Sequence, residues 1–333
     1  MGTAGLLGTM RAKSLQAVPM ATESPFSQVS YVDIGPEQAG QRLDNFLIKT
    51  LKGVPKSRIY RLLRKGEVRV NKGRVKAVTR LKEGDIVRLP PIRVAERGEM
   101  PAVGRPLSQY LADNVLFEDE GLLIINKPSG LAVHGGSGVS LGAIEALRAE
   151  HPELRFLELV HRLDRDTSGC LMLAKKRSVL LALQQDMQRN HIEKRYTALA
   201  KGRWPKGKNT INAPLRKNTL LSGERMVRVD VTGKASVTHF KILKQYPVAT
   251  LLDIKLETGR THQIRVHCEF AGQPLAGDPK YGDEQFNESL KPMGLKRLFL
   301  HARYLRFKHP LSDDWVEVEA PLPADLEKVL AKL

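Results

Sequence analysis

The amino-acid sequence predicts an α+β protein with two domains. A chain of 333 residues is longer than most single domains, so two packed cores are expected. Short apolar segments of strand length outnumber the helical patterns and do not alternate with them, which favours α+β over repeated βαβ units. The positive charge is concentrated near the N-terminus, which sets a small basic domain apart from the rest.

The basic surplus points to a polyanionic partner. Lys and Arg number 54 against 36 Asp and Glu, which gives a net charge of +18. Nucleic acid is the first candidate for a partner of such a chain. Residues 41–92 hold fifteen Lys or Arg and four Asp or Glu, so +11 of the surplus is local. This concentration argues against the alternative, a generally basic enzyme with evenly spread charge.

Composition also excludes several classes of protein. No apolar run reaches eighteen residues, so no membrane-spanning helix is predicted. Cys170 and Cys268 are far apart and form neither a disulfide framework nor a zinc knuckle. The N-terminus lacks the apolar stretch of an export signal. We therefore expect a cytoplasmic protein, and we expect it to act as a monomer.

The first domain is expected at residues 29–92, after a leader of residues 1–28 that we interpret as disordered. Apolar residues at helical spacing predict a first short helix: Leu43, Phe46, Leu47 and Leu51. Ser57 is the expected cap of a second helix, and Gly66 is placed to end it. Short strands should follow at Val68–Val70 and Asp85–Leu89, with a hairpin turn at Asn71-Lys72-Gly73.

One face of the second helix is cationic. Arg58, Arg61 and Lys65 lie at positions i, i+3 and i+7 and therefore project from the same side. The segment from Gln41 to Leu89, with "SRIYRLLRKGEVRVN" and "LKEGDIVRLP", resembles the αL RNA-binding motif of small-subunit ribosomal protein four. The three side chains are thus candidate RNA contacts.

A linker rich in proline is expected at residues 93–112, and a second domain at residues 113–333. Helices are predicted after Ser140, Ser178 and Thr261. The strand candidates of this domain are Leu122–Asn126, Cys170–Ala174, Tyr196–Ala200, Val237–Tyr246 and Ala249–Leu256.

The densest group of reactive side chains is "HRLDRDTSG" at residues 161–169, just before an apolar strand. Asp164 and Asp166 suggest the paired carboxylates of a glycosidase, but their spacing around a turn does not settle which way they point. A zinc site on His262 and His267 is disfavoured because residues five apart do not share a helix face. "HGGSG" at residues 134–138 is neither a Walker loop nor a dinucleotide fingerprint.

Four ordered motifs resemble the ribosomal large-subunit pseudouridine synthases. They are "NKPSG" at 126–130, "HRLDRDTSG" at 161–169, "KRYTAL" at 194–199 and "GRTHQIRVH" at 259–267. The resemblance implies a catalytic domain built on a mixed, largely antiparallel sheet. It also implies isomerisation of uridine in large-subunit ribosomal RNA, without cofactor or metal: the N1–C1′ bond breaks, uracil turns, and C5 rejoins C1′.

The same resemblance assigns roles to single residues. Asp164 matches the essential aspartate, which either adds to C1′ or removes the C2′ proton, and both routes stay open. Arg265 matches the arginine that pairs with that aspartate, and a guanidinium within reach stabilises a carboxylate charge. Tyr196 matches the tyrosine that lies against the target uracil.

Two further residues belong to the expected substrate site. Arg162 matches an arginine that enters the RNA stack when the target nucleotide flips out, with phosphate contact as its alternative. His161 is expected in the substrate site, where we interpret it as shaping the loop through hydrogen bonds to the backbone and not as taking part in bond breaking. Two other functions remain open: the same chemistry on transfer RNA, and a non-catalytic RNA-binding factor in ribosome assembly.

Overall fold

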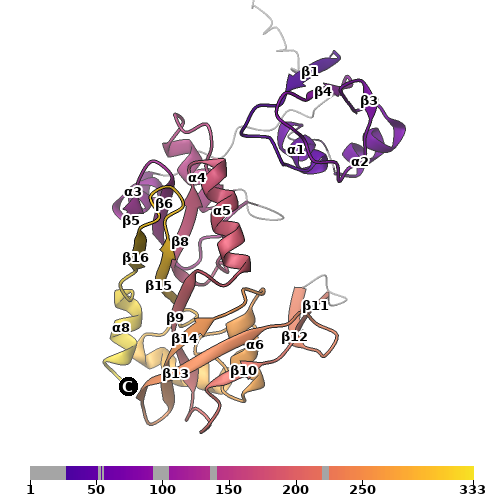
Figure 1. The fold of residues 1–333 in the computed structure, drawn as a ribbon. Helices are drawn as coiled ribbons and strands as arrows, with labels where there is room; N and C mark the ends of the chain where they lie inside the picture. The colour runs from indigo at the N-terminus through magenta and orange to yellow at the C-terminus, as the bar shows by residue number, and fades with distance from the viewer. Residues whose placement is uncertain (1–27, 52–53, 55, 93–104, 136–140, 220–224) are drawn as a thin grey trace, which may run out of the picture. The chain divides into compact units, whose positions relative to one another are not determined.

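The computed structural model describes residues 28–51, 54, 56–92, 105–135, 141–219 and 225–333 (Figure 1). The chain divides into two compact units, Met1–Gly98 and Glu99–Leu333. None of the described helices is long and apolar enough to cross a membrane. The expected leader lies outside the described residues, apart from its last one.

The first unit packs two helices, α1 (Leu43–Thr50) and α2 (Lys56–Lys65), on a small antiparallel sheet. The sheet has the strand order β1-β4-β2-β3. Its strands are β1 (Ser30–Asp33), β2 (Arg69–Val70), β3 (Gly73–Arg74) and β4 (Ile86–Leu89). The apolar positions predicted for the first helix are all buried, because they form the stripe that faces the sheet.

The turns of this unit confirm two predictions and correct a third. Gly66 ends α2 in a left-handed conformation, with φ of 69°. Asn71 and Lys72 both have positive φ, as a tight hairpin turn between β2 and β3 requires. Ser57 falls inside α2, which begins one residue earlier, so it is not the residue that precedes the helix. Strand β1 was not predicted.

The second unit is built on one large sheet with the strand order β10-β13-β14-β9-β15-β8-β6-β5. Two more strands join it, β7 (Glu158–Leu159) on β8 and β16 (Trp315–Glu319) on β15. Among the described ladders only β8 with β15 is parallel, which confirms a mixed, largely antiparallel sheet. The other bounds are β5 (Val115–Glu118), β6 (Leu122–Lys127), β8 (Ser168–Ala174), β9 (Glu193–Lys201), β10 (Thr210–Asn212), β13 (Val237–Gln245), β14 (Ala249–Leu256) and β15 (Leu300–Lys308).

Helices and a separate hairpin flank this sheet. The hairpin consists of β11 (Leu215–Thr219) and β12 (Arg225–Val229), and β12 contacts α6. The helices are α3 (Arg105–Asp113), α4 (Ala143–Glu150), α5 (Arg177–Gln188), α6 (Gln263–Phe270), α7 (Glu284–Leu290) with a short 3-10 turn after it at Lys291–Met293, and α8 (Ala324–Leu330). The three predicted helices and five predicted strands of this domain are all present.

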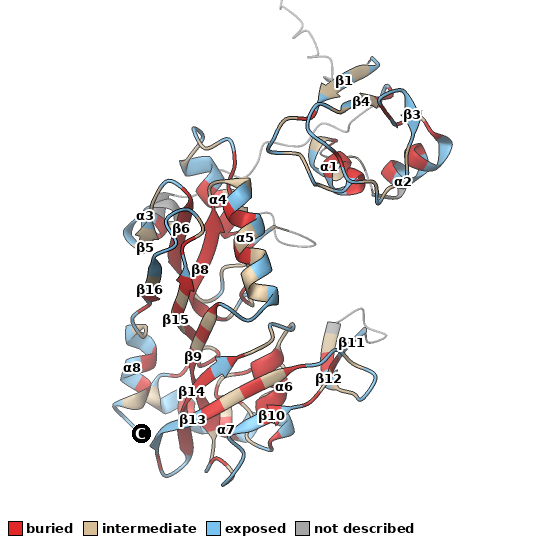
Figure 2. Cartoon of the chain, in the orientation of Figure 1, coloured by how far each residue is buried: buried red, intermediate tan, exposed pale blue. Residues whose placement is uncertain are grey.

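Strands β6 and β8 are buried along their whole length, as Figure 2 shows in red. Successive side chains of a strand point to opposite faces, so each strand contributes to two cores. Leu123 and Ile125 belong to one core, whereas Leu122 and Ile124 belong to the other. Burial on both faces explains why the sequence of these strands is almost continuously apolar.

Helix α3 changes the predicted start of the second domain. Residues 105–112 were assigned to the linker, yet they are helical, and Leu111 is fully buried in the core of the second unit. The proline at position 106 lies in the first turn of the helix, where the missing N–H costs nothing. The linker therefore ends before residue 105.

Gly169 fixes the position of the loop that precedes β8. Its φ is 109°, a conformation that side chains rarely adopt. A Cβ atom at this position would lie 2.2 Å from the carbonyl oxygen of Ala302 on the parallel strand β15. Glycine thus allows β15 to pass close to β8 directly after the "HRLDRDTS" segment.

Replacing Gly169 with alanine should lower the free energy of unfolding by about 3 kcal/mol or more, since overpacking and backbone strain each cost about 1 to 3 kcal/mol. Chemical denaturation measures this loss. Gly259→Ala is the matched control, because no atom lies within 4 Å of the added carbon. Equal stabilities of the two variants would contradict the close-approach explanation.

Candidate active site

Asp164 lies in the loop between β7 and β8 and lines a pocket on the second unit. Tyr196 of β9 and the residues around the start of α6 line the same pocket. Asp164, Tyr196 and Arg265, which three different motifs of the sequence supply, therefore come together. The side chain of Asp164 keeps 25% of its surface exposed, so it is accessible to a substrate.

Hydrogen bonds from the "NKPSG" segment hold the loop that carries Asp164. Lys127 is fully buried, and its Nζ donates to the carbonyl oxygens of Pro128, Leu131 and Arg165. The amide of Gly130 donates to the same oxygen of Arg165 at 2.9 Å. Burial lowers the pKa of Lys127 to about 7, against the opposing negative charges of Asp166 and Asp164. Three acceptors match the three N–H groups of an ammonium, so this side chain positions the loop.

Arg265 makes its strongest contacts with a carboxylate that the sequence did not single out. Its Nε and Nη2 each donate to Asp278 at 2.7 Å, a two-pronged pair with both side chains buried. Its Nη1 lies 3.6 Å from Oδ2 of Asp164. The predicted pairing with Asp164 is thus present as an ion pair, but the hydrogen bonds that hold the guanidinium belong to Asp278.

Asp278 is held in the charged form that this pair needs. Burial acts to raise its pKa, but the hydrogen bonds and charge of Arg265 outweigh burial, and the pKa is lowered. The backbone amides of Lys280 and Tyr281 also donate to Oδ1. Asp278 therefore ties α6 to the loop before α7 and fixes the direction of Arg265.

His262 is the second group that faces Asp164. Its backbone is left-handed, with φ of 54°, at the residue that precedes α6. The Val227 amide donates to the hydroxyl of Tyr281, which lies 2.8 Å from Nδ1 of His262 and can donate to it. The other ring nitrogen, Nε2, lies 3.9 Å from Oδ2 of Asp164. Burial lowers the pKa of His262, against the charge of Asp164.

Tyr196 is buried next to Asp164, with 8% of its surface exposed. Burial raises its pKa, and the negative charge of Asp164 raises it further. The phenol is therefore protonated near neutral pH. Its ring forms part of the pocket wall, where a flat aromatic surface can stack on a base.

The other predicted substrate residues lie in different surroundings. Arg162 is exposed and lines the pocket beside Asp164. His161 is not among the lining residues: its Nε2 accepts from the amide of Met172 on β8, and burial lowers its pKa to about 4. This contact favours the loop-shaping explanation for His161. The basic side chains predicted on α2 are exposed and belong to the first unit: Arg58, Arg61 and Lys65.

Among the residues that the structure describes, no group of three or more His, Cys, Asp or Glu is arranged to hold a metal ion. His267, which the sequence considered as a ligand, is buried and contacts the Thr238 hydroxyl and the Ala213 carbonyl. These contacts give it a structural role between α6 and β13.

Comparisons with known proteins show to which family this chain belongs. Residues 121–270 match the family model described as RNA pseudouridylate synthase, and residues 41–87 match the S4 domain. Proteins of Escherichia coli (strain K12) and Haemophilus ducreyi, both named ribosomal large subunit pseudouridine synthase C, are 54% and 53% identical to this chain. Each alignment covers 94% of this chain and 99% of the relative. The chain belongs to the RNA pseudouridylate synthase family.

Solved structures agree with this family and with its fold. Human RNA Pseudouridylate Synthase Domain Containing 4 has a TM-score of 0.57 at 26% identity, over 68% of this chain and 95% of that protein. Human RNA Pseudouridylate Synthase Domain Containing 1 has a TM-score of 0.54 at 26% identity, over 69% and 87%. The α+β fold with a pseudouridine synthase domain is thus confirmed, and the chain is an enzyme of this class.

Sequence reasoning missed two residues that hold side chains of the pocket, Asp278 beside Arg265 and Tyr281 beside His262, and gave His262 itself another role. Asp278 and Tyr281 lie in "GDPKYG" at residues 277–282, a segment without helical or strand periodicity. An acidic residue enclosed by glycine and proline in a loop was the available signal. His262 was considered only as a zinc ligand. The role of each depends on a contact between distant segments.

Loss of the buried ion pair between Arg265 and Asp278 should destabilise the folded protein. Arg265→Leu should lower the free energy of unfolding by about 3 to 5 kcal/mol, because Asp278 is left buried without its partner. The double variant Arg265→Leu/Asp278→Leu should lose much less than the sum of the single losses. Denaturant titration of all three proteins measures this, with Arg228→Ala, in an exposed pair, as the control. Additive losses would show that the two side chains do not depend on each other.

Proposed function

We propose that this enzyme converts uridines of large-subunit ribosomal RNA to pseudouridine, with Asp164 as the catalytic residue. The RNA class is taken from the names of relatives that align over nearly their whole length. The observation that carries the catalytic assignment is the position of Asp164. Its Oδ2 faces Arg265 at 3.6 Å and His262 at 3.9 Å, in a pocket that Tyr196 also lines.

The reaction needs a carboxylate beside the sugar and room for a base to turn. The N1–C1′ bond breaks, the uracil rotates, and C5 bonds to C1′ before losing its proton. Asp164 either adds to C1′ or takes the C2′ proton, and both routes require an oxygen with a free lone pair. Because Oδ2 faces the two nitrogen donors, we propose that Oδ1 is the oxygen presented to the ribose.

Tyr196 supports the turning base in this proposal. Its ring stacks on the uracil, which keeps the detached base in the pocket. Because its raised pKa keeps the phenol protonated, the hydroxyl does not act as a preformed base. It assists removal of the C5 proton by accepting that proton while its own proton passes to water.

The remaining predicted contacts deliver the RNA. Arg162, exposed beside the pocket, enters the stack when the target nucleotide flips out, since the glycosidic bond is inaccessible in paired RNA. The cationic face of α2, with Arg58, Arg61 and Lys65, contacts RNA phosphates through the S4 domain. We further propose that the enzyme acts as a monomer in the cytoplasm, where ribosomal RNA is modified.

Release of tritium from C5-labelled uridine tests the function. Purified large-subunit RNA should release tritium with the wild-type enzyme, and transfer RNA should not. Asp164→Asn should abolish release but keep RNA affinity, because the substitution removes the charge and preserves the shape. Residual turnover within about tenfold of wild type, or about 1.4 kcal/mol in barrier, would refute the catalytic role. Release from transfer RNA alone would favour the alternative substrate, and release from neither a non-catalytic RNA-binding factor.

Tyr196→Phe separates the ring from the hydroxyl. Stacking should survive, so RNA affinity should stay near that of wild type, whereas the single-turnover rate should fall by about 10² or more if the hydroxyl passes a proton. Filter binding and rapid-quench measurements give the two quantities separately. A normal rate would restrict Tyr196 to stacking.

A further inference from the structure

Ser168 ends the loop that carries Asp164 and begins β8. The residue is buried, with 1% of its surface exposed. The amide of Thr167 donates to the carbonyl oxygen of Asp164 at 3.2 Å, so a tight turn connects Asp164 to the residue before Ser168. Because this short turn separates the two side chains, a shift of Ser168 also moves Asp164.

Two side chains from another part of the chain meet the Ser168 hydroxyl. Nδ1 of His301 lies 2.9 Å from Oγ, and Nη1 of Arg297 donates to Oγ at 3.2 Å. His301 is also the strand partner of Ser168 in the parallel ladder between β8 and β15, which consists of two residue pairs. The side-chain contacts therefore reinforce a short ladder at the end of the loop.

The direction of each hydrogen bond follows from the chemistry of the groups. The carbonyl oxygen of Ala320 lies 3.1 Å from Nε2 of His301 and can only accept, so Nε2 carries a proton. Burial lowers the pKa of His301 to about 4, so the ring is neutral near pH 7 and its Nδ1 is an acceptor. The Ser168 hydroxyl therefore donates to His301 and accepts from Arg297.

Arg297 is anchored by Asp325 in the first turn of α8. Its Nε donates to Oδ2 at 2.7 Å and its Nη2 to Oδ1 at 3.2 Å, which makes a two-pronged pair. The hydrogen bond from Arg297 lowers the pKa of Asp325, although burial opposes this shift, so the carboxylate stays charged. With Nε and Nη2 held in this way, Nη1 is directed at Ser168.

The backbone of Arg297 contacts the loop that carries Asp278. A Cβ atom at Gly277, the residue before Asp278, would lie 2.0 Å from the carbonyl oxygen of Arg297. The glycine, with φ of 69°, lets the two segments approach this closely. Arg297 thus contacts the start of the Asp278 loop through its backbone and the end of the Asp164 loop through its side chain.

We propose that Arg297 and Ser168 are positioning residues for the catalytic carboxylate. They set the 3.6 Å distance between Asp164 and Arg265, because their contact joins the two loops on which these side chains depend. The proposal rests on the function proposed above and adds two residues that do not line the pocket. Loss of the contact should slow the chemical step and leave RNA binding intact, since a shift of about 1 Å in a reacting group can cost about 10²-fold in rate.

Ser168→Ala removes the hydroxyl and tests this role. The single-turnover rate at saturating RNA should fall by about tenfold to a hundredfold, whereas RNA affinity should stay near that of wild type. Thr250→Val is the control, because Thr250 is also fully buried and its hydroxyl lies 2.6 Å from the carbonyl oxygen of Gly202. The control should lower the melting temperature and keep the wild-type rate. All rates are measured below the melting transition of every variant, so a loss of stability alone does not lower them.

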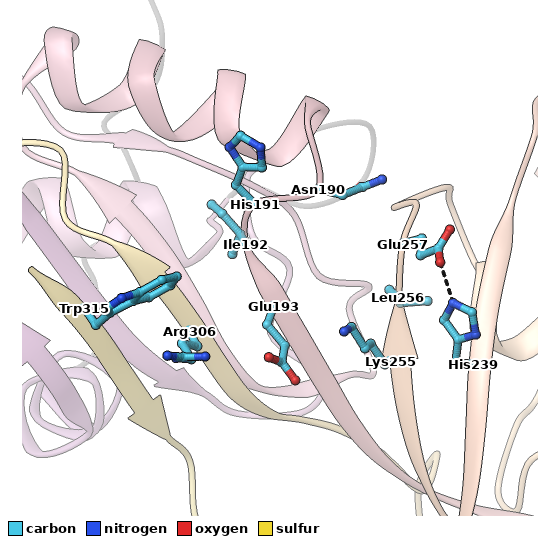
Figure 3. Close-up of a pocket in the computed structure, with 10 residues that line it drawn as sticks. All are labelled: Asn190, His191, Ile192, Glu193, His239, Lys255, Leu256, Glu257, Arg306 and Trp315. Atoms are coloured by element: carbon cyan, nitrogen blue, oxygen red, sulfur yellow. Dashed lines mark hydrogen bonds and ion pairs between the residues drawn. The ribbon is translucent and has the colours of Figure 1, made fainter. Parts of the chain in front are cut away.

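A double-mutant cycle shows whether the two residues act through one contact. Arg297→Met should slow the reaction about as much as Ser168→Ala, and the double variant should be no slower than the slower single variant. Arg306→Met is the matched control and should react at the wild-type rate. Arg306 pairs with Glu317 at 2.9 Å and lies over the ring of Trp315, in the cavity shown in Figure 3.

A wild-type rate in Ser168→Ala would overturn the proposal, as would rate losses of the two single variants that multiply in the double variant. A fall in RNA affinity that accounts for the whole loss of activity would overturn it too. If Ser168→Ala does not fold, Arg297→Lys replaces it. An ammonium has no fork to hold Asp325 and Ser168 together, so the rate should fall in the same way, and a wild-type rate would contradict the proposal.

Asp164→Asn, measured in the same assay, keeps two kinds of failure apart. Wild-type turnover in Asp164→Asn would refute the proposed function, and with it the role of the two positioning residues. An inactive Asp164→Asn together with a wild-type rate in Ser168→Ala would overturn the positioning role alone.

Discussion

The buried pair between Arg265 and Asp278 is the interaction on which the active site depends. It joins α6 to the loop before α7 through two hydrogen bonds of 2.7 Å between side chains that are almost fully buried. One side of the guanidinium is thereby occupied, and only Nη1 is left to face Asp164. The loop that Asp278 organises also carries Tyr281, whose hydroxyl orients His262. One ion pair thus directs both donors toward the proposed catalytic carboxylate.

Other contacts hold the loop that carries Asp164. Its loop has no regular structure, and backbone groups of such a segment need partners when they are partly buried. Lys127 and Gly130 supply those partners for Arg165, and Gly169 lets β15 close over the end of the loop. Preorganisation of this kind suits the proposed role of Asp164, because the carboxylate is then in place before the glycosidic bond breaks.

The positive surplus of the chain suits a protein that binds RNA. The S4 domain holds most of the surplus, but four basic side chains also line a cavity beside the pocket: Arg216, Lys217, Lys234 and Arg260. The cavity shown in Figure 3, on the same unit, is lined by acidic as well as basic side chains, so their charges offset each other. Electrostatic attraction to phosphates is sequence-independent, so a basic surface of this kind positions RNA without selecting a nucleotide.

The sequence by itself determined the α+β class, the basic N-terminal domain and the segments that meet at the pocket. These features are local: strand periodicity, helix stripes, charge counts and motifs can all be read along the chain. It also brought Asp164, Tyr196 and Arg265 into one proposed site through resemblance. The predicted linker was too long because α3 is short and has proline as its second residue, so the burial of Leu111 in the core was not visible locally. Only the tertiary structure decided that Asp278 is the principal partner of Arg265, and that the Tyr281 hydroxyl contacts Nδ1 of His262. Such pairings depend on distances between segments far apart in sequence, and on burial that makes an unpaired charge costly, and neither is encoded in the spacing of residues along the chain.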